Sequence, residues 1–184
     1  MQAQDNATAF LLWYEPLHER FARYCASRAT GLDSAEDIAQ DAILSALEQW
    51  DRLEDKSRLL PYMIGIVNNR VRNALRSARV HRCFLEERGR ILSERLPARQ
   101  ELALDLQYLL RAIDRLPEAS REALLLSTVS GFSLREVAEI QNATEGAVKV
   151  RISRARKQLR ETFNEDGKPL SIGERLQIYA SILL

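Results

Sequence analysis

Cysteine and histidine are scarce in this chain, whose 184 residues contain two of each. Two cysteines are too few for a disulfide framework, so the composition favours a reducing compartment, the cytoplasm. Only His81 and Cys83 lie close together, and no second pair follows at metal-binding spacing, so we expect no metal site and no cofactor. The sequence has no run of about 18 apolar residues, and its first residues lack the features of a signal peptide. We therefore expect no membrane insertion.

Motifs of catalysis are also missing. The sequence contains no glycine-rich phosphate loop, no Gly-x-Ser-x-Gly elbow and no His-Glu-x-x-His motif. Aspartates are frequent, but their spacing places them on helix faces and not in a recognisable pocket. An enzyme is therefore not expected.

The formal net charge of +1 conceals three blocks of opposite sign. Residues 33–55 contain eight acids and one arginine, and residues 70–90 contain seven arginines and two glutamates. Residues 146–160 contain six cations and no acid. Such blocks indicate at least two kinds of partner. The alternative is that each block is merely the solvated face of a helix.

Apolar residues recur at helical spacing along most of the chain, and no segment alternates with period two. We expect an all-α protein with two small helical domains joined by a flexible linker. In the first domain, apolar residues mark a helical region up to about Gly31, a second helix from about Asp33 to Trp50, and a third over roughly 57–80. The pattern weakens after Val80, resumes near Leu102 and changes at Pro117, where a new helix can begin. The boundaries are therefore 8–80, a linker over 81–103, 104–163, and an extension over 164–184 that can pack back on the second domain.

Two capped helices joined by a tight turn are predicted over residues 133–163. Ser133 and Glu136 form a capping box, "QNA" is the turn, and Thr144 caps the long helix that follows. This pattern is typical of a helix-turn-helix module. Its second helix carries the cations on the side opposite its apolar stripe, which suits the major groove and DNA phosphates.

Residues 112–161 resemble the promoter −35-binding region of bacterial RNA polymerase sigma factors of the extracytoplasmic-function group. The matching motifs are Leu116-Pro117, Glu136-Val137-Ala138, Val148-Lys149 and Arg154-Ala155-Arg156. Ala147 and Val150 depart from the family pattern. The −35 DNA-binding residues that the resemblance and the helix face imply are Ser133, Thr144, Glu145, Gly146, Lys149, Val150, Arg151, Ser153, Arg154 and Arg156.

The N-terminal half is similar to the same family. "AEDIAQDAILSALEQW" (35–50) resembles the region that docks on the clamp helices of the largest polymerase subunit. Its expected contact residues are an exposed leucine among polar and acidic side chains: Asp37, Gln40, Asp41, Leu44 and Glu48. The next helix resembles the segment that opens and reads the −10 element, with a pocket around residues 51–58. Its expected DNA-binding residues are Asn69, Arg72, Asn73, Arg76 and Arg79.

The resemblance implies an alternative sigma factor that binds core RNA polymerase, recognises −35 and −10 promoter elements and is controlled by an anti-sigma factor. Such a protein acts in the bacterial cytoplasm, free or held near the membrane by its inhibitor. The alternative is a stand-alone helix-turn-helix regulator that binds duplex DNA without replacing sigma. The sequence shows no sustained heptad pattern for dimerisation, which disfavours this alternative.

Overall fold

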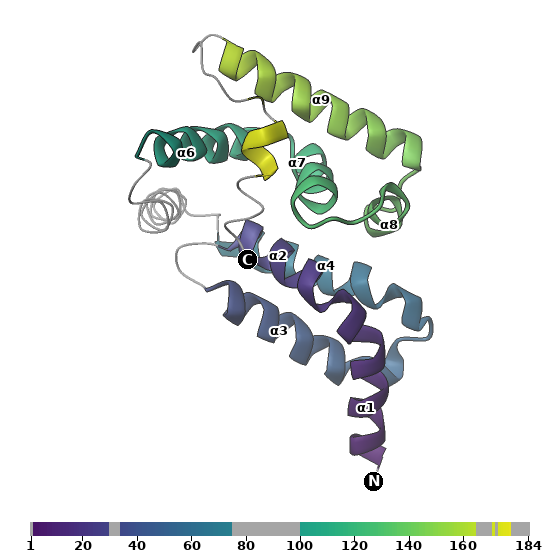
Figure 1. Cartoon of the computed structure of the whole chain (residues 1–184). Coiled ribbons are helices and arrows are strands. Elements are labelled where there is room, and N and C mark those ends of the chain that lie inside the picture. Colours follow the sequence, from purple (N-terminus) through teal and green to yellow (C-terminus); the bar gives the residue numbers. More distant parts are fainter. Residues whose placement is uncertain (1, 30–33, 75–99, 165–170, 172, 178–184) are drawn as a thin grey trace.

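The computed structural model describes residues 2–29, 34–74, 100–164, 171 and 173–177. These residues fold almost entirely into helices, and no strand occurs among them. Figure 1 shows two helical layers, with the C-terminal half lying on the N-terminal half. Across these ranges we find no helix with the length and apolar character needed to cross a bilayer. The all-α, two-domain prediction is confirmed.

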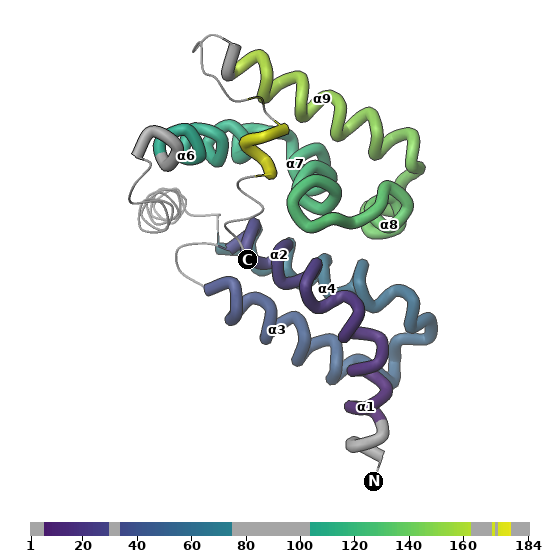
Figure 2. Tube along the Cα trace, in the orientation of Figure 1, coloured from purple at the N-terminus to yellow at the C-terminus, as the bar shows by residue number. Residues whose placement is uncertain are grey.

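The first domain packs four α-helices and three short 3₁₀ turns (Figure 2). In chain order they are α1 (Gln2–Tyr14), η1 (Glu15–Leu17), α2 (His18–Arg28), α3 (Ala35–Glu48), η2 (Trp50–Arg52), η3 (Lys56–Arg58) and α4 (Leu59–Ala74). Ser34 begins α3 by accepting a hydrogen bond from the Asp37 amide, while the Asp37 carboxylate accepts one from the Ser34 amide. These two bonds satisfy amides that the first helical turn leaves open.

Aromatic residues build the core of the first domain where its N-terminal helices meet α3. Phe10 stacks on Tyr14, and the Trp50 ring meets Phe10 edge to face. The first helical region is interrupted at Pro16, where η1 separates α1 from α2. Because α1 turns the side of Phe10 and Tyr14 inward, Leu11 and Leu12 are exposed. Leu11 and Leu12 are among the apolar residues that mark the first helical region in the sequence, but the structure places both on its outer side.

The second domain consists of α6 (Gln100–Asp114), α7 (Glu118–Leu124), the wide π-type turn η4 (Leu125–Val129), α8 (Leu134–Ile140) and α9 (Glu145–Asn164). α6 begins within the segment expected to be linker, of which residues 81–99 lie outside the described residues. Val148, Ile152, Ala155 and Leu159 form the buried stripe of α9, which packs on α7, α8 and α6. The outer side of α9 faces away from the first domain (Figure 1).

Gly131 occupies the turn between η4 and α8 with a φ of +77°. A Cβ there would meet no other atom within 4 Å, so the cost of a side chain is conformational. We expect Gly131→Ala to lower the free energy of unfolding by about 1–2 kcal/mol. Gly65→Ala is the control, since Gly65 lies inside α4 with open space at its Cβ. That change should raise stability by about 0.5–1 kcal/mol. Denaturant unfolding of both variants measures the two shifts, and a stable Gly131→Ala variant would contradict the first.

Part of the C-terminal extension packs on the second domain. Residues 173–177 are helical, and Ser171 and Glu174 form a capping box before them. Leu176 is fully buried, and Arg175 donates a hydrogen bond to the Asp105 carboxylate of α6 at 2.5 Å. The expected intramolecular packing is thus found for this segment, while residues 178–184 of the extension lie outside the described residues.

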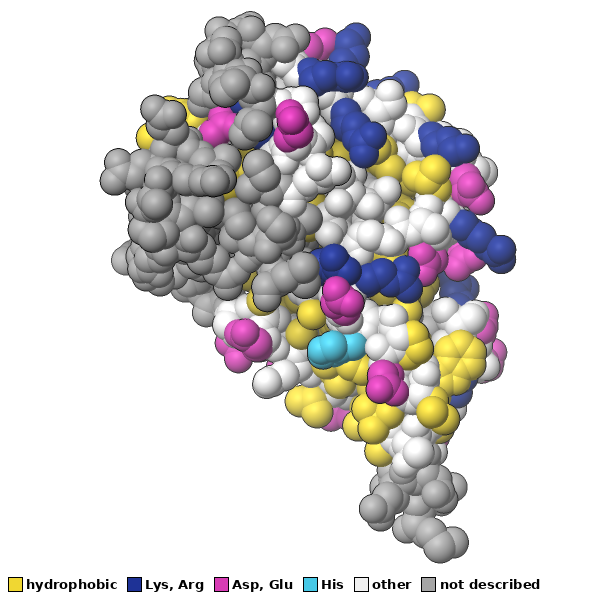
Figure 3. All heavy atoms as spheres, in the orientation of Figure 1, with side chains coloured by type: hydrophobic (Ala, Val, Ile, Leu, Met, Phe, Trp, Pro, Cys, Tyr) yellow, Lys and Arg dark blue, Asp and Glu magenta, His cyan; other side chains and the backbone are white. Residues whose placement is uncertain are grey.

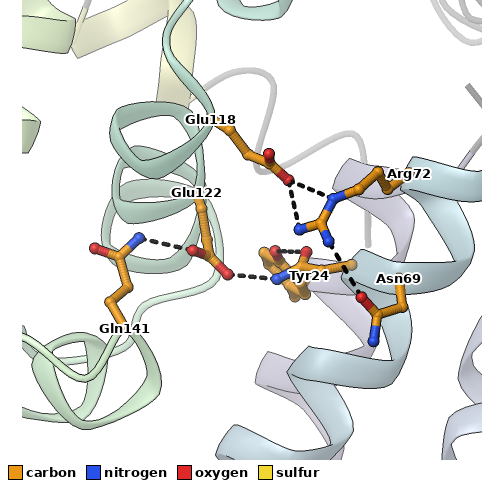
Figure 4. A network of polar contacts seen from close by, with 7 residues as sticks. Tyr24, Asn69, Arg72, Glu118, Glu122 and Gln141 are labelled. Carbon is orange, nitrogen blue, oxygen red and sulfur yellow. Dashed lines mark hydrogen bonds and ion pairs between the residues drawn. The ribbon is translucent and has the colours of Figure 1, made fainter. Parts of the chain in front are cut away.

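The two domains meet through α2 and α4 on one side and α7, η4 and α8 on the other. Arg20 of α2 binds the Glu136 carboxylate at 2.9 Å, and its guanidinium lies 4.7 Å from the centre of the Phe132 ring. Arg72 of α4 binds Glu118 of α7 at 3.1 Å. Figure 4 shows this second contact and its neighbours.

Candidate protein and nucleic-acid interfaces

The acidic side of α3 faces solvent. The inward residues Ile38, Ala42 and Ala46 follow helical spacing and leave Asp37, Gln40, Leu44 and Glu48 on the exposed side. Leu44 exposes 57% of its surface, an unusual exposure for a leucine in the middle of a helix. Asp41 is half-buried. The structure therefore brings the five predicted polymerase-binding residues together on one accessible surface.

An open groove of about 460 Å³ runs between this surface and α4. Asp41, Leu44, Ser45 and Glu48 line one wall, and Ile66, Asn69, Arg70 and Asn73 line the other. Arg70 forms an ion pair with Asp41 across the groove. The groove thus combines apolar contact from Leu44 and Ile66 with carboxylates and amides. Such a surface suits a helical partner that carries basic side chains.

Asp37 has a second role that the sequence analysis did not assign to it. Its carboxylate accepts a hydrogen bond from the Ser34 amide at 3.2 Å and completes the capping box of α3. Asp37 therefore stabilises the helix start, whether or not it also contacts a partner. Gln40, Leu44 and Glu48 take no part in this capping box, so changes at these residues probe an interface without disturbing the helix start.

The predicted −10 surface lies on the last two turns of α4. Asn69, Arg72 and Asn73 are exposed there, whereas Arg76 and Arg79 lie outside the described residues. Arg72 donates to the Asn69 side-chain oxygen at 3.3 Å and to Glu118 of the second domain at 3.1 and 3.4 Å. Amides and guanidiniums of this kind can bind phosphates and unstacked bases.

The loop before α4 is fixed by contacts that the sequence did not reveal. The Asn6 amide of α1 donates to both carboxylate oxygens of Asp51 at 2.8 and 2.7 Å. Lys56 lies over the Trp50 ring and donates to the Trp50 carbonyl oxygen. Asp55 caps η3 by accepting bonds from Ser57, which lowers the pKa of its carboxyl. These contacts hold residues 51–58 in a defined shape beside α4.

The helix-turn-helix unit forms as the capping residues predict. Ser133 and Glu136 cap α8 reciprocally, and the Thr144 hydroxyl accepts from the Ala147 amide at 3.2 Å to cap α9. Asn142 takes a left-handed φ of +46° in the tight turn. Burial raises the pKa of Glu136, but hydrogen bonds from Ser133 and the Arg20 guanidinium outweigh burial and lower it overall. Glu136 is therefore charged at neutral pH.

The outward face of α9 is accessible and basic. Glu145, Gly146, Lys149, Val150, Ser153, Arg154 and Arg156 are exposed, and Figure 3 shows lysine and arginine side chains gathered over this helix. Arg156 also donates to the Thr128 hydroxyl at 3.2 Å. Arg151 differs from the rest, because it is half-buried and donates to the Gln141 side-chain oxygen at 2.6 Å. Ser133, Thr144, Arg151 and Arg156 thus have contacts within the domain, and of these Arg156 is also exposed with the remaining predicted residues.

Within the described ranges, no three histidine, cysteine or acidic residues cluster as metal ligands. Cys25 is buried, and burial raises the pKa of its thiol to about 12, so it is neutral at physiological pH. The pair formed by His81 and Cys83 lies outside the described residues.

Several interface residues were missed by the sequence analysis. Arg70 and Ile66 complete the groove wall, and Asn68 and Glu122 join the two domains. Arg70 belongs to a recognised basic block, which was the available signal for it. No pattern in the sequence pointed to the contact between Asn68 and Glu122, because these residues are 54 positions apart.

Comparison with known proteins agrees with this geometry. Residues 13–80 match the family model described as Sigma-70 region 2, and residues 106–159 match the one described as Sigma-70, region 4. The chain is 30% identical over 146 residues to the ECF RNA polymerase sigma factor EcfG of Rhodopseudomonas palustris, covering 78% of this chain and 79% of that protein. It is 32% identical over 132 residues to the RNA polymerase sigma factor CarQ of Myxococcus xanthus, covering 71% and 75%.

Two solved structures share the fold. CnrH, solved with the cytosolic domain of CnrY, aligns with a TM-score of 0.62 at 23% identity over 90% of this chain and 94% of that chain. The sigma factor RpoE of Bartonella quintana, solved with the anti-sigma factor NepR, aligns with a TM-score of 0.54 at 27% identity over 89% and 99%. With both sigma regions present in order and relatives matched over most of their length, this chain belongs to the extracytoplasmic-function group of the sigma-70 family of RNA polymerase sigma factors.

Proposed function

We propose that this chain binds core RNA polymerase and directs it to promoters by recognising −35 and −10 elements. The observation that supports this best is the separation of two exposed surfaces of opposite character. The acidic surface with Leu44 belongs to α3 of the first domain, and the basic face belongs to α9 of the second. One surface suits a protein partner with basic side chains, and the other suits DNA.

In this proposal, residues 8–80 bind the polymerase and the −10 element, and residues 104–163 bind the −35 element. Residues 81–103 connect them, and 164–184 form an extension. The α3 surface docks on the clamp helices of the largest subunit, with Leu44 as apolar anchor. A single apolar side chain surrounded by polar groups is typical of an interface hot spot.

DNA recognition is divided between two faces. Lys149, Arg154 and Arg156 contact phosphates while Gly146 and Val150 approach base edges in the major groove. Asn69, Arg72 and Asn73 hold the single-stranded −10 region beside the braced loop 51–58. The chain is a transcription initiation factor, and we assign the chemistry of RNA synthesis to the polymerase alone.

We further propose that an anti-sigma factor controls this chain in the cytoplasm and can hold it near the membrane. The support is that the sigma factor RpoE of Bartonella quintana was solved with such a partner. The partner of this chain is not identified by that likeness.

Purified core polymerase provides the test. We expect the chain to co-migrate with core enzyme in native gels and to start transcription at a subset of a promoter library. Failure to bind core enzyme even at low salt would contradict the proposal. Tight binding to duplex operators without polymerase would instead support a stand-alone regulator.

A further inference from the structure

Two carboxylates of the second domain contact α4, one at Arg72 of the predicted −10 face and one at the neighbouring Asn68. Glu118 of α7 accepts two hydrogen bonds from the Arg72 guanidinium, at 3.1 and 3.4 Å. One turn along α7, the Glu122 carboxylate accepts a hydrogen bond from the Asn68 amide of α4 (Figure 4). Both acceptors therefore lie on one side of α7, opposite one side of α4.

A carboxylate and a phosphate bind a guanidinium in the same way. Both present paired anionic oxygens that accept two N–H groups of an arginine side by side. Arg72 cannot give the same two N–H groups to Glu118 and to a DNA phosphate. Contact between α7 and α4 therefore competes with binding of DNA through these two N–H groups of Arg72.

The network continues from this contact into both domains. The buried Tyr24 hydroxyl donates to the Asn68 side-chain oxygen at 2.7 Å, and burial raises the pKa of Tyr24, which keeps it a donor. On the other side, Gln141 donates to Glu122 at 2.8 Å and accepts from Arg151 of α9 at 2.6 Å. The position of α7 on α4 is thus linked to the helix that carries the −35 face.

The ion pair between Arg72 and Glu118 is weak enough to open. Arg72 and Glu118 are about half-exposed, and exposed ion pairs change an equilibrium by about fivefold or less. Arg121 of α7 pairs with Asp114 of its own domain at 3.4 Å and adds no ion pair across the domains among the described contacts.

We propose that Glu118 and Glu122 form an internal latch, in which Glu118 competes with promoter DNA for Arg72 while Glu122 holds α7 to Asn68 of α4. This inference rests on the proposed function. In the closed form the −10 face is partly occupied by carboxylates, whereas the outer face of α9 stays open. The −35 element can therefore bind first, and domain separation then frees the −10 face.

The test uses the full chain with Glu118→Gln and Glu122→Gln combined. The matched control combines Glu139→Gln and Glu161→Gln, which removes two charges of the same domain that pair within their own helices. Circular dichroism first checks that each variant folds. Small-angle scattering then measures the radius of gyration, and fluorescence anisotropy measures binding of a labelled single-stranded dT12 oligonucleotide.

We expect the latch variant to show a larger radius of gyration and about threefold to tenfold tighter oligonucleotide binding, with the control unchanged. An unchanged radius, or equal gains in both variants, would overturn the latch, since equal gains would reflect net charge alone. Binding of core polymerase is measured in parallel. If the unaltered chain does not bind core polymerase, the proposed function is contradicted. The scattering result decides separately whether Glu118 and Glu122 hold the two domains together.

Discussion

Replacing Arg175 with alanine is expected to lower the free energy of unfolding of the second domain by about 3–5 kcal/mol. Arg175 is 1% exposed and donates to the Asp105 carboxylate, which is itself buried, at 2.5 Å. Removing the guanidinium leaves that carboxylate in a site that water hardly reaches. A buried charge that loses its counter-ion is one of the most destabilising changes a single substitution can make.

Two further variants separate this effect from the loss of any arginine. Arg135→Ala removes an arginine whose pair with Glu139 lies on the surface of α8, so it should change stability by less than about 1 kcal/mol. Asp105→Leu combined with Arg175→Met should recover most of the lost stability, because a buried apolar pair can replace a buried ion pair. Denaturant unfolding of all three proteins gives the comparison. A loss for Arg175→Ala as small as that for Arg135→Ala would show that the extension is not fastened at this site.

Local sequence patterns predicted the helices well because each pattern is enforced by nearby residues. The capping box at Ser133 and the cap at Thr144 involve groups three positions apart, so they are visible in the sequence. The side of α1 that faces inward depends instead on Phe10 packing against Trp50, forty positions away. Spacing alone therefore did not show that Leu11 and Leu12 face outward.

The candidate site shows the same division. The exposed residues of α3 and α9 followed from helical periodicity, because the inward stripe of each helix fixes its outward face. The ion-pair partners of charged surface residues could not be predicted in this way. Asp41 pairs with Arg70, Arg72 with Glu118 and Arg20 with Glu136, and each pair forms only when distant helices pack. Arg72, one of the three predicted −10 arginines, is thus held by a carboxylate of the other domain, a contact that spacing could not supply.

The two exposed surfaces can be tested against each other, because each should fail in a different assay. Combining Lys149→Ala with Arg154→Ala removes two exposed cations of α9. Promoter affinity should fall by about tenfold to a hundredfold and its salt dependence should weaken, because fewer phosphates are neutralised. Binding of core polymerase should not change. The matched control, Lys157→Ala with Arg160→Ala, removes the same charge farther along α9 and should have a smaller effect.

Asp41→Arg should weaken binding of core polymerase and leave promoter binding unchanged. It places a cation beside Arg70 and removes most of the negative charge of the α3 surface, where a basic partner is expected, so core binding should weaken by more than about tenfold. The isolated protein should keep its affinity for −35 duplexes, because α9 lies on the other domain. Glu19→Arg, at an exposed position of α2, is the control for charge reversal alone and should bind core enzyme normally. If both the Asp41 and the α9 variants lost only thermal stability, with core and promoter binding intact, neither surface would be an interface. Failure of one assay per variant is the pattern that a division of labour between the two domains requires, since damage to a shared fold would impair both assays together.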